Sequence, residues 1–232
     1  MSTTLTLTSE EQSMLDGEHG PAVAMCMRII VGVARANGAE KLIEIESVHA
    51  DGTLYHGEAG LDFTEKLVEL GGKVKVKTTT NVGSLDLLHP NLVHGDETLM
   101  AHGRRLMDAH IALGCEPTWS CAPYQAGHRP AFGSHVAWAE SNAIAFVNSV
   151  LGARSDRYGD FLDLSAAVTG RVPFGGLHHD EARKAVLVLD FSNIDQKVFS
   201  EDAAWAALGV ILGNRAGTRV AAMVGLPGDL SD

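Results

Sequence analysis

The sequence lacks long hydrophobic runs and any segment that would direct export. The longest apolar run, residues 29–34, contains Gly32 and stops at Arg35, well short of the roughly 20 apolar residues of a membrane span. The first residues are rich in Ser and Thr and then acidic, with no basic segment and no cleavage site, so no secretory signal is predicted. We therefore expect a cytoplasmic protein that does not associate with membranes.

Positive charge is also scarce, since the formal net charge is −11 at pH 7. Nucleic-acid binding depends on clusters of Lys and Arg, and the sequence contains none, so no nucleic-acid partner is expected. Lys73, Lys75 and Lys77 alternate with apolar residues, which is typical of the outward face of a strand. Walker, GxSxG and GxGxxG motifs are absent, which leaves nucleotide binding and serine hydrolysis without support.

Cysteine is rare, with 3 residues in the chain, and an odd number does not indicate a disulfide framework in a cytoplasmic protein. Cys26 lies in an apolar segment and is predicted to be a buried hydrophobic residue. Cys115 and Cys121 show neither Cys-x-x-Cys nor Cys-x-x-His spacing, and an extended segment between them would span on the order of 20 Å. Spacing leaves two alternatives open for Cys121, a metal ligand or a free thiol.

What the sequence does contain is a regular alternation of strand and helix patterns. With 232 residues, 45% of them hydrophobic, the chain can bury a sizeable core. A capping box of Thr8 and Glu11 begins a short first helix. The alternation predicts an α/β fold with a partly parallel sheet flanked by helices, and no boundary is predicted within residues 1–232. Further helices are predicted at 22–36, 62–70, 96–113, 136–151, 160–169 and 201–212, and strands at 41–47, 73–77, 115–121, 184–191 and 220–224.

Polar loops follow the carboxyl ends of three predicted strands. His49 follows the strand at 41–47, and polar residues at 78–84 and 121–128 follow the next strands. In open α/β sheets, ligands bind in the crevice beyond those strand ends. The loops are therefore predicted to line one shared pocket.

The polar residues are densest between Cys115 and Asp163, where they interrupt apolar segments. Buried polar groups cost free energy unless they are paired, so this density indicates an active site. His128 suits either a general acid or base or a hydrogen-bonded loop residue. Arg154 and Arg157, with Asp156 and Asp160, suit either a structural ion-pair network or a clamp for a substrate carboxylate, and both alternatives stay open.

Five motifs stand out along the chain: LTSEEQSMLDGEHG, Ser47-Val48-His49, VKTTTNVGSLDLLHP, PTWSCAPY and, above all, WAESNAIAFVNSVLGARSDRYGDFLDLSAAVTGRVP. Together they resemble the aconitase X family, a branch of the aconitase superfamily. The resemblance implies an aconitase-like fold and a dehydratase that contains an iron–sulfur cluster. It also implies a small swivelling-domain subunit as partner and, as substrate, cis-3-hydroxy-L-proline or mevalonate 5-phosphate.

The resemblance also assigns roles to individual residues. Cys121 matches the second cysteine of the family pattern PT-C-x-C-x-PY and becomes the expected cluster ligand, whereas Trp119 stands at the position of the first. The other ligands are expected beyond Asp232. Expected catalytic residues are His49, Ser141, Asn142 and Arg154, and expected substrate-binding residues are Thr80, Asn81, Ser84 and Glu140.

Three functions are compatible with the sequence. We expect the large subunit of a hydro-lyase acting on cis-3-hydroxy-L-proline. A mevalonate 5-phosphate dehydratase would need a cationic phosphate site, for which the predicted loops offer few basic residues. The last residues, VGLPGDLSD, predict a strand and the start of a helix, a point at which an α/β domain seldom stops. The fold is therefore expected to be incomplete at its C-terminus, which also allows a non-catalytic fragment.

Overall fold

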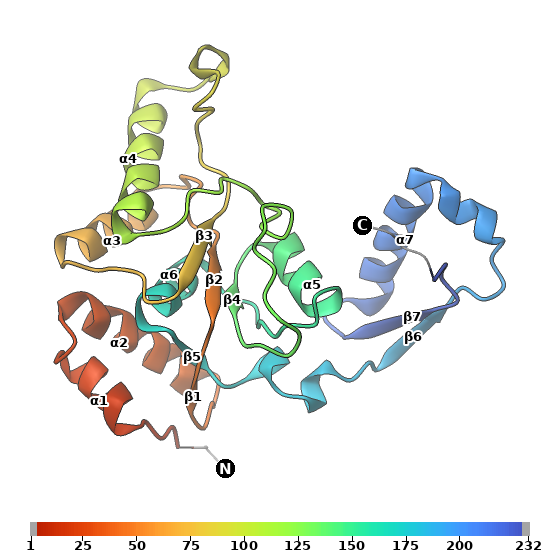
Figure 1. Ribbon diagram of the computed structural model, residues 1–232, viewed down its shortest axis with the longest axis horizontal. Coiled ribbons are helices and arrows are strands. Elements are labelled where there is room, and N and C mark those ends of the chain that lie inside the picture. The colour runs from red at the N-terminus through yellow and green to blue at the C-terminus, as the bar shows by residue number, and fades with distance from the viewer. Residues whose placement is uncertain (1–3, 229–232) are drawn as a thin grey trace. The chain divides into compact units, whose positions relative to one another are not determined.

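The computed structural model describes residues 4–228 (Figure 1). It divides into two compact units, Met1–His178 and His179–Asp232, at a point where the sequence patterns predict no boundary. Each unit is described separately below. Within the described residues, no helix is both long and apolar enough to cross a membrane.

The first unit contains most of the regular structure. Its helices are α1 (Ser9–Asp16), α2 (Pro21–Ala36), α3 (Glu58–Glu69), α4 (Glu97–Leu113), α5 (Ser141–Ser149) and α6 (Asp160–Thr169), with short 3₁₀ turns at Pro90–Leu92 and Gly176–His178. Its strands are β1 (Leu42–Glu44), β2 (Ser47–Ala50), β3 (Lys77–Thr80), β4 (Ala137–Trp138) and β5 (Arg171–Pro173).

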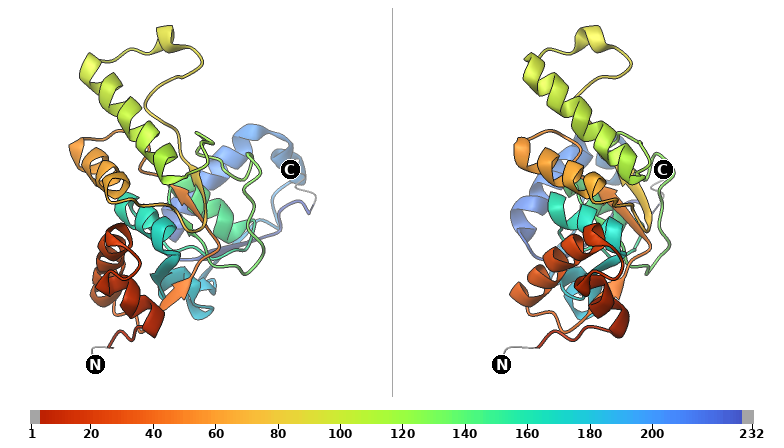
Figure 2. Two further views of the ribbon diagram at one scale, coloured as in Figure 1. Left: turned by 60° about the vertical axis from the view of Figure 1, so that its left-hand side comes forward. Right: turned by 90° about the vertical axis from the view of Figure 1, so that its left-hand side faces the viewer.

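A three-stranded parallel sheet forms the centre of this unit, in the order β3-β2-β4 (Figure 1). Every residue of β2 is buried, as expected for the middle strand of a parallel sheet. One face packs Val48, Ala50 and Ala137 against Leu164 and Val168 of α6 in the main hydrophobic core. Figure 2 shows α2, α6, α3 and α4 following one another in a single layer of helices. This layer of helices therefore does not cover the opposite face of the sheet.

Local signals place the helices where the sequence predicts them. Thr8 and Glu11 form both hydrogen bonds of the capping box. Asp96 caps α4 by accepting a hydrogen bond from the Leu99 amide, and Gly114 ends that helix in the left-handed region. Helix α6 has the predicted bounds. Helix α3 begins earlier than predicted, at Glu58, because Gly57 provides the helix start.

Three strand predictions are wrong in their bounds. The segment predicted as one strand at 41–47 breaks after Glu44, so that β1 pairs with β5 in an antiparallel sheet while β2 joins the parallel sheet. The predicted strand at 73–77 lies later, at Lys77–Thr80. Residues 115–121 form only an isolated bridge between Thr79 and Glu116. Strand periodicity shows where extended chain occurs, but pairing partners decide which part of it is a strand.

The predicted helix at 136–151 also differs from the structure. Its first part is strand β4, and the helix α5 starts only at Ser141. Glu140 separates them, with φ 70°, which an α-helix does not allow. The apolar run was ambiguous because a short buried strand and a buried helix have the same composition.

The second unit consists mainly of a strand, helix, strand sequence. Strands β6 (Leu187–Asp190) and β7 (Ala221–Val224) pair in parallel, and α7 (Asp202–Ala216) connects them, with 3₁₀ turns at Glu181–Arg183 and Gln196–Ser200. The sequence predicts the order of these elements. It wrongly predicts a strand buried on both faces, since alternate residues of β6 are exposed.

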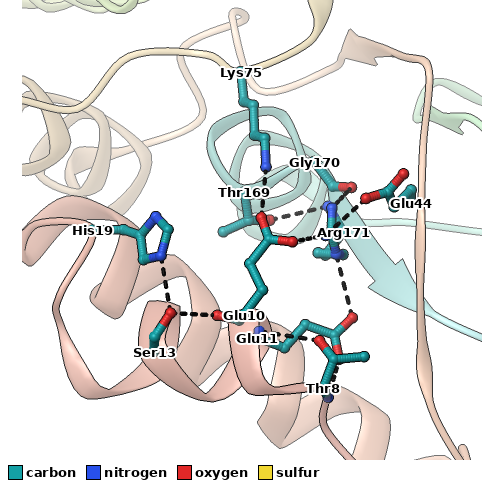
Figure 3. Close-up of polar contacts among 10 residues, drawn as sticks. All are labelled: Thr8, Glu10, Glu11, Ser13, His19, Glu44, Lys75, Thr169, Gly170 and Arg171. Carbon is teal, nitrogen blue, oxygen red and sulfur yellow. Dashed lines mark hydrogen bonds and ion pairs between the residues drawn. The ribbon is translucent and has the colours of Figure 1, made fainter.

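An ion-pair cluster around the buried Arg171 joins the start of the chain to β5 (Figure 3). The Arg171 side chain is 5% exposed; its Nε lies 3.3 Å from Glu11 Oε1, and its Nη2 lies 3.2 Å from Glu10 Oε2 and 2.9 Å from Glu44 Oε1. The other Glu11 oxygen accepts a hydrogen bond from the Thr8 amide at 2.8 Å. Glu11 thus both caps α1 and neutralises a buried guanidinium.

We expect Arg171→Met to lower the free energy of unfolding by about 3–5 kcal/mol, because the buried Glu11 carboxylate would lose its cation. Arg105→Met is the matched control. Arg105 pairs with Glu65 at 2.6 Å, but the two side chains are 50% and 36% exposed, so its loss should cost about 1 kcal/mol or less. Urea unfolding followed by circular dichroism measures both. Equal losses in the two variants would contradict the assignment.

Candidate functional site

The face of the parallel sheet opposite α6 carries an in-register row of polar and aromatic side chains. His49 on β2 is paired with Thr79 on β3 and with Trp138 on β4. Because paired residues of neighbouring strands point to the same face, the three side chains lie side by side. This inner row is buried, with 0% exposure of His49 and Trp138 and 1% of Thr79.

A second row follows two residues later on each strand, just beyond the carboxyl ends. It consists of Asp51, Asn81 and Glu140. The Asn81 amide group donates hydrogen bonds to both carboxylates, to Asp51 and, at 2.5 Å, to Glu140 Oε2. The polar residues after three parallel strands therefore meet at one edge, where α/β sheets bind ligands. The sequence predicted such an edge, but with the loop at 121–128 as its third part, whereas the third strand is β4 and the third residue is Glu140.

Burial controls the electrostatics of this outer row. It raises the pKa of Asp51 to about 6, with a further upward contribution from Glu140, while the hydrogen bond from Asn81 acts in the opposite direction. Asp163 of α6 is fully buried behind Asp51 and accepts a hydrogen bond from the Asp51 amide at 2.8 Å. Burial raises the pKa of Asp163 well above its ordinary value. The edge thus holds carboxyl groups that bind a proton unusually readily.

Cys121 is the one cysteine of the chain that is not buried. Burial of its thiol and the nearby charge of Glu140 raise its pKa, and a hydrogen bond from the Val82 amide lowers it. Cys26 and Cys115 are buried, which raises the pKa of each thiol to about 12. Only Cys121 therefore presents sulfur to the Asp51–Glu140 edge.

Thr79 of the inner row bridges two buried histidines, His49 and His128. Thr79 Oγ1 is 2.9 Å from His49 Nδ1 and 2.8 Å from His128 Nδ1. Burial lowers the pKa of His49 to about 3 and that of His128 to about 4, so both rings are neutral at pH 7. Because the threonine hydroxyl donates only one proton, one imidazole accepts that proton and the other donates to the oxygen.

Two non-glycine residues with positive φ flank the site, Trp119 at 45° and Glu140 at 70°. They are the only such residues in the described part of the chain. A conformation of this kind costs of order 1–3 kcal/mol and persists only where the surrounding structure holds it. At Glu140 it turns the chain from β4 into α5, with the carboxylate at the Asn81 amide.

Of the residues predicted from the sequence, the structure brings five together. Asn81 and Glu140 belong to the outer row. Asn142 donates to the backbone carbonyl of Cys121 at 2.8 Å, and Ser141 Oγ lies 3.4 Å from Glu140 Oε1. The first turn of α5 therefore contacts both the cysteine loop and the acidic edge.

The other predicted residues have different surroundings. His49 belongs to the inner row. Thr80 is buried and donates to the Glu116 carbonyl at 3.3 Å, and Ser84 accepts a hydrogen bond from the Tyr55 amide at 2.7 Å. Arg154 donates to the His178 carbonyl at 3.0 Å. The hydrogen bonds of Thr80, Ser84 and Arg154 to backbone groups are of the kind that holds loops in place.

Five residues of the two rows and their surroundings were not selected from the sequence: Asp51, Thr79, His128, Trp138 and Asp163. His128 was considered and left between two roles. A signal for Asp51 existed, because it follows His49 by two residues and therefore shares its strand face. Asp163 ends the polar-rich stretch that begins at Cys115, but no signal singled it out within the apolar helix α6.

The residues present fit only part of a metal site. Within residues 4–228, no group of three or more His, Cys, Asp or Glu side chains could hold a metal ion. Cys121 alone offers an accessible thiol, next to carboxylates. The described residues thus fit one protein ligand of an iron–sulfur cluster, not a complete set.

Comparison with known proteins identifies relatives along nearly the whole chain. Residues 4–181 match the family model described as aconitase X first domain. The chain is 40% identical over 220 residues to cis-3-hydroxy-L-proline dehydratase of Hypocrea jecorina, covering 95% of this chain and 37% of that protein. It is 38% identical over 216 residues to the phosphomevalonate dehydratase large subunit of Thermococcus kodakarensis, covering 92% of this chain and 53% of that protein.

The fold agrees with a solved structure. The crystal structure of the holo form of Thermococcus kodakaraensis aconitase X matches with a TM-score of 0.82 at 36% identity, over 94% of this chain and 54% of that one. The chain thus spans between about a third and about half of the length of these relatives. The match of residues 4–181 to the family model, together with these identities, shows that the chain belongs to the aconitase X family.

Proposed function

We propose that the chain is the first part of a cytoplasmic hydro-lyase large subunit that eliminates water from a hydroxylated carboxylic acid. The observation that carries the proposal is the Asp51–Asn81–Glu140 row beside Cys121, at the carboxyl ends of three parallel strands. Both kinds of relative described above are named as dehydratases. Because this chain spans only part of their length, the complete activity requires further residues.

The preferred substrate is cis-3-hydroxy-L-proline, the compound named for the Hypocrea jecorina relative. Carboxyl groups dominate the site edge, and no Lys or Arg of the described residues bonds to Asp51, Glu140 or Asp163. A phosphate group would meet repulsion there unless cations came from elsewhere. Mevalonate 5-phosphate, which the archaeal relatives suggest, is therefore the second candidate.

Asp51 is the residue best suited to move a proton. A carboxyl group with a pKa of about 6 exchanges its proton near neutral pH, which is the condition for an efficient general acid or base. The amide group of Asn81 holds the carboxylates of Asp51 and Glu140 in fixed positions. In this role Asp51 removes the proton next to the substrate carboxylate, and Glu140 and Asn81 orient the reacting groups.

Cys121 would hold an iron–sulfur cluster together with ligands outside the described residues. When bound, such a cluster supplies a Lewis acid for the departing hydroxide. Asn142 fixes the backbone of Cys121. His128 anchors the other end of the same loop, through its hydrogen bond to Thr79 on β3. The loop is thus attached at both ends to elements that carry the acidic edge.

A small swivelling-domain subunit is the proposed partner, because several relatives are named as large subunits. It would supply groups that the described residues lack, including counter-charges for a carboxylate substrate. The alternative is a non-catalytic fragment that folds without the cluster. The iron and sulfide content of the protein distinguishes a cluster-containing large subunit from a non-catalytic fragment.

In protein assembled with the partners that complete its module and purified without oxygen, we expect Cys121→Ser to lose bound iron and acid-labile sulfide. Cys115→Ala is the control, because this cysteine is buried with a thiol pKa of about 12 and should leave metal content unchanged. Chemical iron and sulfide analysis measures both. Undiminished iron in Cys121→Ser would contradict the assignment, and absence of iron in every form would favour the non-catalytic alternative.

In the same assembled enzyme, we expect Asp51→Asn to lower kcat by about 10²–10⁴-fold, the usual contribution of a general base. Wild-type activity should rise with pH through an apparent pKa near 6, because the base acts in its ionised form and burial raises the pKa of Asp51 to about 6. The apparent pKa of this profile is a property of the Asp51–Glu140 pair as a whole. The pH dependence of the remaining activity should therefore differ in Asp51→Asn. Asp62→Asn, at an exposed residue of α3, should keep the wild-type profile.

We expect the stability of the wild-type chain to fall more between pH 7.5 and 5 than that of His128→Gln, by about 2 kcal/mol. The folded-state pKa of about 4 lies below the unfolded value of about 6.5. The contribution of His128 is therefore complete above pH 6.5 and is lost as the pH falls towards 4. Urea unfolding at the two pH values measures the difference. Parallel changes in both proteins would show that His128 is not held neutral.

A further inference from the structure

A cavity of about 170 Å³ lies within the first unit, on the helical side of the chain. It is slightly larger than the engineered cavity of about 150 Å³ that holds a benzene ring. The loop between β2 and α3, the first turns of α3 and α6 and the second half of α4 line it, and it is open to solvent on one side. Its lining residues that matter here are Leu54, Phe63, Leu106, His110, Asp160 and Phe161.

The walls of the cavity are largely apolar. Phe63 and Phe161 meet edge to face, with ring centroids 4.9 Å apart and an angle of 70°. Leu54 and Leu106 also line it. Such walls favour a ligand with a compact hydrocarbon body. Aromatic rings at the cavity also favour a cation over a neutral group of the same shape.

His110 brings an unused hydrogen-bond acceptor to this cavity. The side chain is 1% exposed, and Nδ1 lies 2.9 Å from the Leu106 carbonyl oxygen. A carbonyl only accepts, so Nδ1 carries the proton and Nε2 has a free lone pair. Nε2 has no hydrogen-bond partner within residues 4–228. Burial lowers the pKa of His110 to about 4, so the ring remains an acceptor at neutral pH.

Asp160 places an unpaired negative charge at the rim of the cavity. Its side chain is exposed, and its carboxylate forms no hydrogen bond or ion pair in the described part of the chain. The ion-pair network that the sequence left open as one alternative for Arg157 and Asp160 therefore does not include Asp160 within residues 4–228. Its charge contributes to the raised pKa values of Asp51 and Asp163, so the electrostatic potential in this region favours positive charge.

We infer that this cavity is a binding site for a small aliphatic amine in its ammonium form. The apolar walls would hold the hydrocarbon body, His110 Nε2 would accept one N–H hydrogen bond, and Asp160 would attract the positive charge. The site adjoins the outer row, because Gly52 lines the cavity and follows Asp51 in the chain. The inference goes beyond the proposed function and does not depend on it, since neither Cys121 nor a cluster takes part.

Three five-membered ring compounds of nearly equal size provide the test. Pyrrolidine carries a charged N–H group at pH 7.5, cyclopentanol carries a neutral O–H donor, and tetrahydrofuran has no donor. We expect pyrrolidine to bind about tenfold more tightly than tetrahydrofuran, the gain of one charge-assisted hydrogen bond, with cyclopentanol between them. Amide chemical-shift changes in the ¹⁵N-labelled chain measure each affinity and should be centred on the cavity residues.

Two variants separate the contribution of the Asp160 charge from that of the hydrogen bond to His110. Asp160→Asn should remove the advantage of pyrrolidine over cyclopentanol, and His110→Leu should remove the advantage of cyclopentanol over tetrahydrofuran while pyrrolidine keeps the part of its advantage that comes from the Asp160 charge. Asp62→Asn is the control, because it removes an exposed charge that does not line the cavity, and it should leave the relative affinities of the three compounds unchanged. The spectra also report whether each variant is folded. Equal affinities for the three compounds, no binding, or an unchanged preference in Asp160→Asn would overturn the inference. Amine binding by a chain that holds no iron would uphold it while contradicting the proposed function.

Discussion

The parallel register of β2 with β3 and β4 is the constraint on which the rest of the structure depends. It pairs His49 with Thr79 and with Trp138. Because side chains alternate along a strand, the residues two positions later then meet at the strand ends. A shift of one residue in β2 would turn Asp51 and His49 towards α6 and bring Val48 and Ala50 to the site face. The apolar contacts of Val48 and Ala50 with the α6 core prevent that shift.

Burial on the polar face acts in opposite directions on acids and bases, since it disfavours whichever form is charged. It raises the pKa of Asp51 and lowers that of His49 and His128. The face therefore combines neutral imidazoles below with proton-binding carboxyl groups at the edge. A proton enters this face most readily at the outer row, where Asn81 connects Asp51 to Glu140.

Most helices could be predicted from the sequence because their end signals are local, although the helix predicted at 136–151 begins only at Ser141 and α3 begins before Asp62. The capping box of Thr8 and Glu11, the Asp96 cap and the bounds of α6 all depend on residues within one or two turns. Strands were predicted less well. The segment 41–47 carries a single alternating pattern, yet it divides between two sheets, because β1 finds its partner in β5, far along the chain.

The sequence by itself determined the α/β class, the helix ends and the concentration of polar residues after strands, since these follow from composition and short-range periodicity. It also carried the motifs by which the chain resembles its family. Tertiary structure alone decided that Asp51 joins Asn81 and Glu140, that His128 bonds to Thr79, and that His110 meets Asp160 at one cavity. The paired residues lie 30 to 59 positions apart in the sequence. Strand register and helix packing bring them together, and no local sequence pattern encodes either of these.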